Sequence, residues 1–131
     1  MRLNQVTVGA TDFDASVAFY RKLGLRLIVS ADKGYARFEL PDGEATFSIH
    51  LQEEVSTDGP LIYFEVDDVD AEVARLEGLG IGPITPPRDE PWLWREARLA
   101  DPAGNPLCLF KAGTARRYPP WRIESEVITS R

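Results

Sequence analysis

The chain repeats one stretch of its own sequence, and this repeat limits the possible folds more than any other feature. Residues 5–24 align with residues 61–80 without a gap, and seven of the twenty aligned pairs are identical. A repeat of this kind indicates a supersecondary unit that is used twice. The identical pairs are Asp12/Asp68, Asp14/Asp70, Ala15/Ala71, Val17/Val73, Ala18/Ala74, Leu23/Leu79 and Gly24/Gly80.

Each copy of the repeat is typical of a strand followed by a helix. Residues 3–9 alternate in polarity, which predicts a strand, and residues 61–66 predict its counterpart. Thr11 or Asp12 can cap the free N–H groups of a helix, and Gly24 can end it. One face of each expected helix is apolar, with Phe13, Val17 and Tyr20 in the first copy and Val69, Val73 and Leu76 in the second.

Further strands are expected after each helix. In the first half they are residues 25–30, 35–40 and 45–52, and the polar face of the last one carries Thr46, Ser48, His50 and Gln52. A polar linker, 53–60, separates the halves. In the second half, the proline-rich stretch 82–91 predicts an edge strand or a loop. Residues 92–100 and 106–111 predict a hairpin around the turn 101–105.

Composition excludes several classes of protein. The net charge is −6 and the basic residues form no dense patch, so we expect no binding to nucleic acid or to anionic membranes. No apolar run is long enough to span a bilayer. The N-terminus leads directly into a predicted strand without an apolar signal region, and the single cysteine is Cys108. We therefore expect a cytoplasmic protein without disulfides.

Three segments together resemble the vicinal oxygen chelate superfamily, which includes glyoxalases, bleomycin-resistance proteins and extradiol dioxygenases. They are residues 14–24 (DASVAFYRKLG), 64–70 (FEVDDVD) and 101–107 (DPAGNPL). The resemblance implies an α+β fold in which two βαβββ modules form a curved mixed sheet around a cavity. The modules would be about 1–52 and 60–112 of a single domain, 1–112, and the family often forms homodimers.

In metal-using members of this family, the ligands come from the first and last strands of each module. The resemblance assigns these positions to Gln5, His50, Leu61 and Cys108. Leu61 cannot bind a metal, Gln5 is a weak neutral donor, and Cys108 is a soft ligand that suits zinc but not Mg, Mn or Fe. We therefore expect no cofactor, with a divalent metal as the alternative. Without a metal, His50 is a pocket or structural residue and Cys108 a small core residue.

A ligand pocket is predicted from aromatic residues near the end of the second half. Trp92, Trp94, Glu96 and Arg98 share one strand face by alternation. Tyr63 shares the face of Leu61, and Thr7 shares the face of Gln5. Two indoles, a phenol, a carboxylate and a guanidinium can stack and orient a flat ligand. The alternative is that both tryptophans pack at a rim or an interface and that Glu96 and Arg98 form a surface pair.

Three functions remain open from the sequence. The first is a metal-free small-molecule-binding protein similar to bleomycin-resistance proteins, with an aromatic or cationic ligand and a homodimeric assembly. The second is a metal-dependent lyase, isomerase or dioxygenase using Gln5, His50 and Cys108. The third is a metal-free enzyme with His50 or Glu96 as general base. In the tail, 113–131, Trp121 either docks on the body or a second subunit, or belongs to a loosely held terminus.

Overall fold

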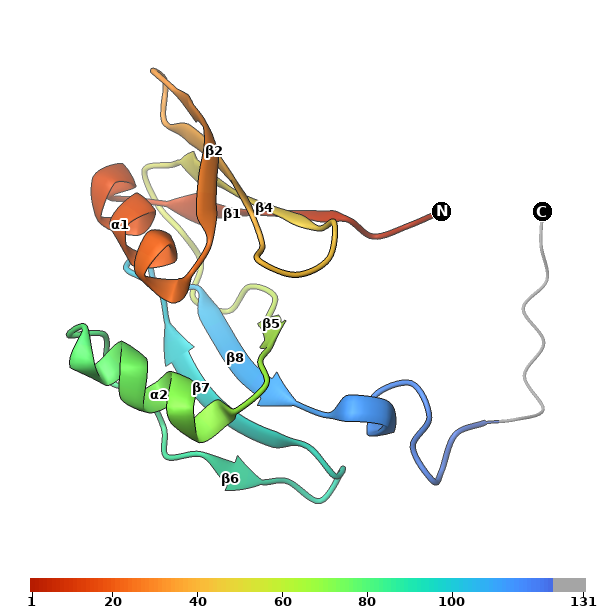
Figure 1. The fold of residues 1–131 in the computed structure, drawn as a ribbon. Coiled ribbons are helices and arrows are strands. Elements are labelled where there is room, and N and C mark those ends of the chain that lie inside the picture. The colour runs from red at the N-terminus through yellow and green to blue at the C-terminus, as the bar shows by residue number, and fades with distance from the viewer. Residues whose placement is uncertain (124–131) are drawn as a thin grey trace.

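The computed structural model describes residues 1–123, which form two consecutive βαβββ modules (Figure 1). The first module contains β1 (Gln5–Ala10), α1 (Phe13–Leu23), β2 (Arg26–Ala31), β3 (Tyr35–Glu39) and β4 (Thr46–Leu51). The second contains β5 (Ile62–Glu65), α2 (Val69–Gly78), β6 (Arg88–Asp89), β7 (Arg95–Ala100) and β8 (Pro106–Lys111). A short 3-10 helix, η1 (Gly113–Ala115), follows β8.

Each module forms its own four-stranded mixed sheet. The strand orders are β1-β4-β3-β2 and β5-β8-β7-β6, so the two sheets have the same topology. The first strand of each module pairs with the last in parallel, and the other pairs are antiparallel. Val6 lies opposite Phe47, and its repeat partner Ile62 lies opposite Leu107. The predicted α+β class with two βαβββ modules is confirmed, with the hydrogen-bonded ladders forming two separate sheets.

The repeated aspartates begin the two helices. The Asp12 side chain accepts a 3.1 Å hydrogen bond from the backbone N–H of Ala15, and Asp68 accepts a 3.0 Å bond from Ala71. These bonds satisfy N–H groups that lack a partner within the helix. Gly24 ends α1 with a φ of 115°, a backbone conformation that residues with a Cβ atom rarely adopt. The identical residues of the repeat therefore mark helix ends.

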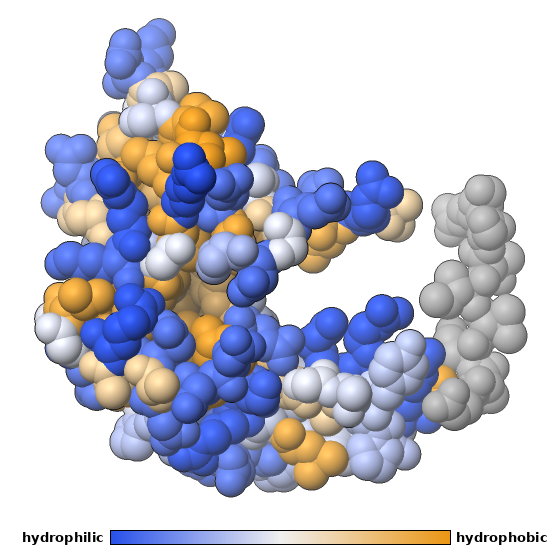
Figure 2. Space-filling view, in the orientation of Figure 1, coloured by the Kyte–Doolittle hydropathy of each residue, from blue (hydrophilic) through white to orange (hydrophobic). Residues whose placement is uncertain are grey.

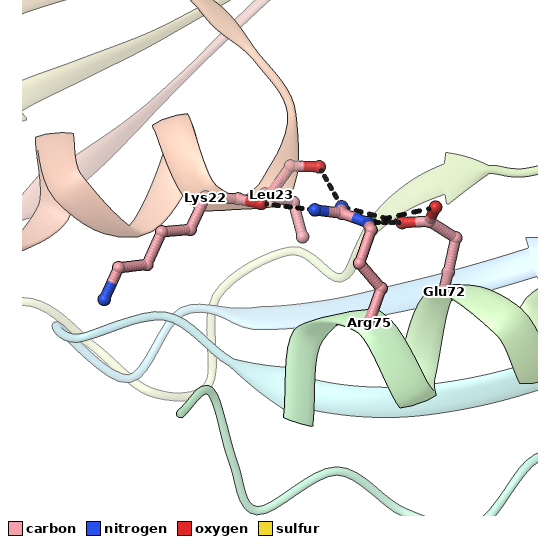
Figure 3. Close-up of polar contacts among 4 residues, drawn as sticks. All are labelled: Lys22, Leu23, Glu72 and Arg75. Atoms are coloured by element: carbon pink, nitrogen blue, oxygen red, sulfur yellow. Dashed lines mark hydrogen bonds and ion pairs between the residues drawn. The ribbon is translucent and has the colours of Figure 1, made fainter. Parts of the chain in front are cut away.

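The two described modules share no hydrogen-bonded strand pair, and side chains hold them together. The rings of Phe47 and Phe64 lie 5.7 Å apart in a core to which both modules contribute. At the surface, Arg75 of α2 reaches the C-terminal end of α1 (Figure 3). Its Nη1 and Nη2 donate to the carbonyl oxygens of Lys22 and Leu23 at 3.0 and 3.1 Å. Glu72 holds the same guanidinium at 2.8 Å.

Two segments differ from the sequence-based predictions. The strand predicted over residues 92–100 begins only at Arg95, because Pro91 precedes it and Leu93 adopts a φ of 70°. The proline-rich stretch is mostly a loop, with the short edge strand β6 inside it. Among residues 1–123, no helix is long and apolar enough to cross a membrane.

The tail does not pack as predicted on the body. Trp121 exposes 56% of its surface, and Tyr118 exposes 59%. Tyr118 instead lies under the guanidinium of Arg122, with 4.4 Å between Cζ and the ring centroid. Docking of Trp121 on this chain's own modules is therefore wrong for the described part of the tail, and docking on a second subunit stays a prediction. The rest of the tail, 124–131, lies outside the described residues.

Candidate functional site

Each sheet has one face on its helix and one open face. In β4, Phe47 and Ile49 point into the core against α1, where the ring of Tyr20 lies 4.6 Å from that of Phe47. Alternation then places Ser48 and His50 on the open face. In the space-filling view, the surface is hollowed between the first residues of the chain and the segment after β8 (Figure 2). The two open faces divide the predicted residues: Gln5, Thr7 and His50 on the first module, and Tyr63, Trp94, Glu96, Arg98 and Cys108 on the second.

Three aromatic rings gather on the open face of the second module. Trp94 stacks on Phe110 with 4.7 Å between ring centroids and an interplanar angle of 27°. Tyr63 meets both rings edge-on, at 6.0 Å from Trp94 and 5.6 Å from Phe110. Phe110 is buried, whereas Tyr63 exposes 47% of its surface. The cluster therefore presents a rigid aromatic wall to an approaching ligand.

Beside this wall lies a buried carboxylate. Glu96 exposes only 4% of its surface, and its Oε2 accepts a 2.8 Å hydrogen bond from Sγ of Cys108. The Nη2 of Arg98 is 3.7 Å from the other carboxylate oxygen. Glu96, Arg98 and Trp92 line a cavity of about 230 Å³ together with Thr85, Arg88 and Glu90. The predicted residues Trp92, Glu96 and Arg98 thus meet, although Trp92 lies in the turn before β7.

Burial determines the state of the thiol. Burial first, and then the hydrogen bond and the negative charge of Glu96, raise the pKa of Cys108 from 9.0 to about 12. The group is therefore a neutral thiol near neutral pH. A protonated thiol donates a hydrogen bond but is neither a nucleophile nor a ready metal ligand. In this structure, the Cys108 thiol fixes the position of the Glu96 carboxylate by donating a hydrogen bond to it.

The residues that the resemblance assigned to metal positions do not converge. Gln5 lies opposite Thr46, whereas His50 lies opposite Gly9, four positions further along the ladder. At about 3.3 Å per residue, this separates Gln5 and His50 by about 13 Å along the strands. Within residues 1–123, no three His, Cys, Asp or Glu side chains lie close enough to hold a metal ion. This donor set does not fit a catalytic metal, and no step of a reaction is assigned to one.

The registers also show which positions of the two modules correspond. With Val6 and Ile62 equivalent, Ser48 corresponds to Cys108, and His50 corresponds to Phe110. The four positions assigned from the resemblance therefore combine residues at different levels of the two sheets. Leu61 precedes β5, two residues before Tyr63, which lies opposite Cys108.

The sequence analysis missed a polar cluster on the open face of the first module. The hydroxyl groups of Tyr35 and Ser48 lie 2.9 Å apart, and Nε of Arg37 donates to the Tyr35 oxygen at 3.0 Å. The hydrogen bond with Ser48, opposed by burial and supported by the bond and charge of Arg37, lowers the pKa of Tyr35. The alternation of Tyr35 and Arg37 along β3 could have shown that both side chains share one face. Their contact with Ser48 on β4 depends on strand register, which the sequence does not give.

Comparison with known structures identifies the same architecture. A bleomycin resistance determinant encoded on the transposon Tn5 superposes with a TM-score of 0.72 at 19% identity, over 86% of this chain and 99% of that one. A lactoylglutathione lyase from Agrobacterium tumefaciens gives 0.69 at 24% identity, over 84% and 92%. An antibiotic binding protein from Streptomyces sp. CB03234 gives 0.68 at 25% identity, over 86% and 97%.

The sequence itself supports the assignment. No match was found among curated proteins. The family model described as Glyoxalase/Bleomycin resistance protein/Dioxygenase superfamily matches residues 2–109, which include every helix and nearly every strand of both modules. With its paired βαβββ modules and their two open sheet faces, the chain belongs to the Glyoxalase/Bleomycin resistance protein/Dioxygenase superfamily.

Proposed function

We propose that this protein binds a flat organic small molecule on the open face of its second module, without a catalytic metal. The observation that carries this proposal is the half-exposed Tyr63 beside the stacked Trp94–Phe110 pair, next to the buried carboxylate of Glu96. Large aromatic surface with a few fixed polar groups is the usual composition of a small-molecule site.

The polar groups favour a ligand that carries an N–H donor or a positive charge. Oε2 of Glu96 accepts a hydrogen bond from the Cys108 thiol, while among residues 1–123 Oε1 has only the longer contact with Arg98. Oε1 therefore has lone-pair capacity for a ligand group. A cation placed over the rings of Tyr63 or Trp94 is attracted by their π faces as well. We therefore propose aromatic amines or other cationic aromatic compounds as the ligand class.

Two related proteins support a binding role. A bleomycin-binding protein in complex with bleomycin superposes with a TM-score of 0.70 at 20% identity, and the antibiotic binding protein noted above has the same fold. These similarities concern the fold, and the ligand of this chain is proposed from its own residues. The missing metal-ligand set favours binding over the lyase, isomerase or dioxygenase chemistry of other family members.

We also propose that the protein is a cytoplasmic homodimer. Tyr63 and Trp92 expose 47% and 41% of their surfaces, which gives the second module apolar surface that a partner subunit could cover. A second copy facing this area would enclose the ligand. Light scattering after gel filtration measures the assembly, and a monomer at micromolar concentration would exclude the dimer.

The binding proposal is tested with a thermal-shift screen of flat aromatic cations and their neutral isosteres, followed by calorimetry on the hits. Trp94→Ala is expected to weaken binding at least about tenfold, since a stacked ring contributes roughly 1 kcal/mol or more. Leu79→Ala, at the exposed end of α2, is the control and should leave the affinity unchanged. Equal affinities of wild type and Trp94→Ala would move the site away from this face.

The metal-free part of the proposal has its own test. The metal content of protein purified without chelator or nickel resin is measured by mass spectrometry, beside a Gln5→Ala/His50→Ala variant. We expect less than a tenth of an equivalent in both. Near-stoichiometric metal that is lost in the double variant would contradict the proposal and favour a metalloenzyme.

A further inference from the structure

The open face of the first module carries an arginine that is held in place but has no acidic partner. Arg37 is half-buried in the middle of β3, its Nε donates to the Tyr35 hydroxyl at 3.0 Å, and its Cζ lies 5.5 Å from the centroid of the Tyr35 ring. No carboxylate of residues 1–123 forms an ion pair with it. The acid two residues further along this face, Glu39, pairs with Arg26 instead, at 3.7 Å.

Hydroxyl groups from three neighbouring strands lie on the same sheet face as this guanidinium. Ser48 lies opposite Arg37 on β4, is completely buried, and has its Oγ 2.9 Å from the Tyr35 hydroxyl. Thr7 lies opposite Ser48 on the next strand, and its exposed side chain points to the same face. Around Arg37, the face therefore combines a positive charge with the hydroxyl groups of Tyr35, Ser48 and Thr7.

The hydrogen-bond directions leave donors available for a ligand. The Tyr35 oxygen accepts from Arg37, and when Ser48 also donates to it, the phenolic hydrogen is directed away from both. The two terminal nitrogens of Arg37 have no hydrogen-bond partner among residues 1–123. These nitrogens form the planar fork that binds carboxylates and phosphates through two parallel hydrogen bonds. The lowered pKa of Tyr35 makes its hydroxyl a stronger donor as well.

We infer that Arg37, Tyr35 and Ser48 form a binding subsite for an oxyanion, the carboxylate or phosphate group of an organic ligand, on the open face of the first module. Arg37 supplies the charge and the bidentate contact. Tyr35 supplies a third donor and fixes the guanidinium plane. Ser48 orients the phenol from its buried position. This subsite is independent of the aromatic wall on the second module, so either can be present without the other.

The test uses inorganic phosphate and acetate as separate probes, at constant ionic strength set with chloride. The Nε–H resonance of Arg37 is followed by NMR and is assigned by its absence in Arg37→Gln. We expect a saturable shift with at least one probe. The affinity, measured from backbone resonances of β3, should fall at least about tenfold in Arg37→Gln and several-fold in Tyr35→Phe, which keeps the ring but removes the donor.

Arg21→Gln is the matched control, because it removes an exposed arginine of the same module that lies on α1, against the opposite face of the sheet. Its affinity should equal that of the wild type. Saturation by phosphate alone, by acetate alone or by both supports the subsite and identifies which source of oxyanion it prefers. No saturable shift with either probe in the wild type, or an equal loss in Arg21→Gln, would overturn the inference.

Discussion

The hydroxyl group of Tyr20 in α1 lies 2.6 Å from Oδ2 of Asp101, in the turn between β7 and β8, and both residues are buried. The same carboxylate oxygen accepts a 2.8 Å bond from Nδ2 of Asn105, which also donates to the carbonyl oxygen of Gly9 at 2.8 Å. The turn of the second module is thus anchored to the first strand and the helix of the first module. Its sequence, 101–105, is one of the segments that carry the resemblance to the family.

Tyr20→Phe removes one donor from this buried carboxylate and should lower the free energy of unfolding by roughly 1–3 kcal/mol. Urea unfolding followed by circular dichroism measures the loss. Tyr118→Phe, which changes an exposed tyrosine in the tail, is the control and should change stability by less than about 0.5 kcal/mol. Equal midpoints for the two variants would show that the modules do not depend on this bond.

The same tyrosine predicts a dependence of stability on pH. Burial first, and then the charge and hydrogen bond of Asp101, raise the pKa of Tyr20 above its ordinary value of 10.0. Above pH 10 the unfolded chain loses this proton while the folded chain retains it, so the free energy of unfolding falls as the pH rises. Below pH 10 the contribution is complete. Urea midpoints measured above pH 10 should fall less steeply with pH in Tyr20→Phe than in the wild type. Parallel curves would contradict the assignment.

The Cys108 thiol should stay protonated in the folded protein up to pH 10. Thiolate formation is followed by absorbance at 240 nm, with Cys108→Ser as the blank that removes the tyrosine signal. In urea the titration should have its midpoint near 9, whereas the folded value is about 12. Glu96→Gln removes a charge that raises the pKa of Cys108, so its thiolate should appear at lower pH. A folded midpoint near 9 would show that the thiol is neither buried nor bonded to Glu96.

A substitution of Arg75 tests whether its contact with the C-terminal end of α1 stabilises the pair of modules (Figure 3). Arg75→Lys keeps the charge but loses the planar fork that spans two carbonyl oxygens, and we expect a loss of about 1 kcal/mol. Arg88→Lys keeps the charge of an arginine whose side chain is 73% exposed and should have almost no effect. Thermal unfolding of both variants distinguishes the contributions, and equal melting temperatures would show that the contact is energetically neutral.

The two helix caps predict a matched pair of effects. Asp12→Ala and Asp68→Ala should each lower stability by about 1 kcal/mol, because each removes the acceptor of an otherwise unpaired helix N–H. Asp14→Ala, in the first turn of α1, removes only a favourable charge near the helix end and should cost a few tenths of a kcal/mol. Denaturant midpoints of the three variants check the order, which fails if Asp14→Ala is as damaging as the caps.

Local features of the fold were predictable from the sequence, and features that depend on register were not. Asp12 and Gly24 identify the ends of α1 because caps act within one turn of a helix. The correspondence of His50 with Phe110 depends on which residues face each other across strands far apart in the sequence. A register shift of one residue moves a side chain to the other face of the sheet. A shift of several residues separates two side chains that were expected to bind the same metal.

The candidate site shows the same division. Glu96 and Arg98 were grouped correctly because both lie on β7. Trp94 was placed in that strand although it lies just before it, and alternation alone did not register the left-handed conformation at Leu93. The bond between Cys108 and Glu96 joins two strands through their antiparallel pairing, so sequence spacing could not reveal it.

The pairing of strands only within one module has an evolutionary consequence. A unit whose strands pair only with one another can be duplicated in a gene without separating paired strands in either copy. Only side chains then need to adapt to hold the copies together, as Phe47 with Phe64 and Tyr20 with Asp101 do here. Once joined, the two copies can differ, and here one open face is aromatic beside a carboxylate while the other carries a guanidinium beside hydroxyl groups.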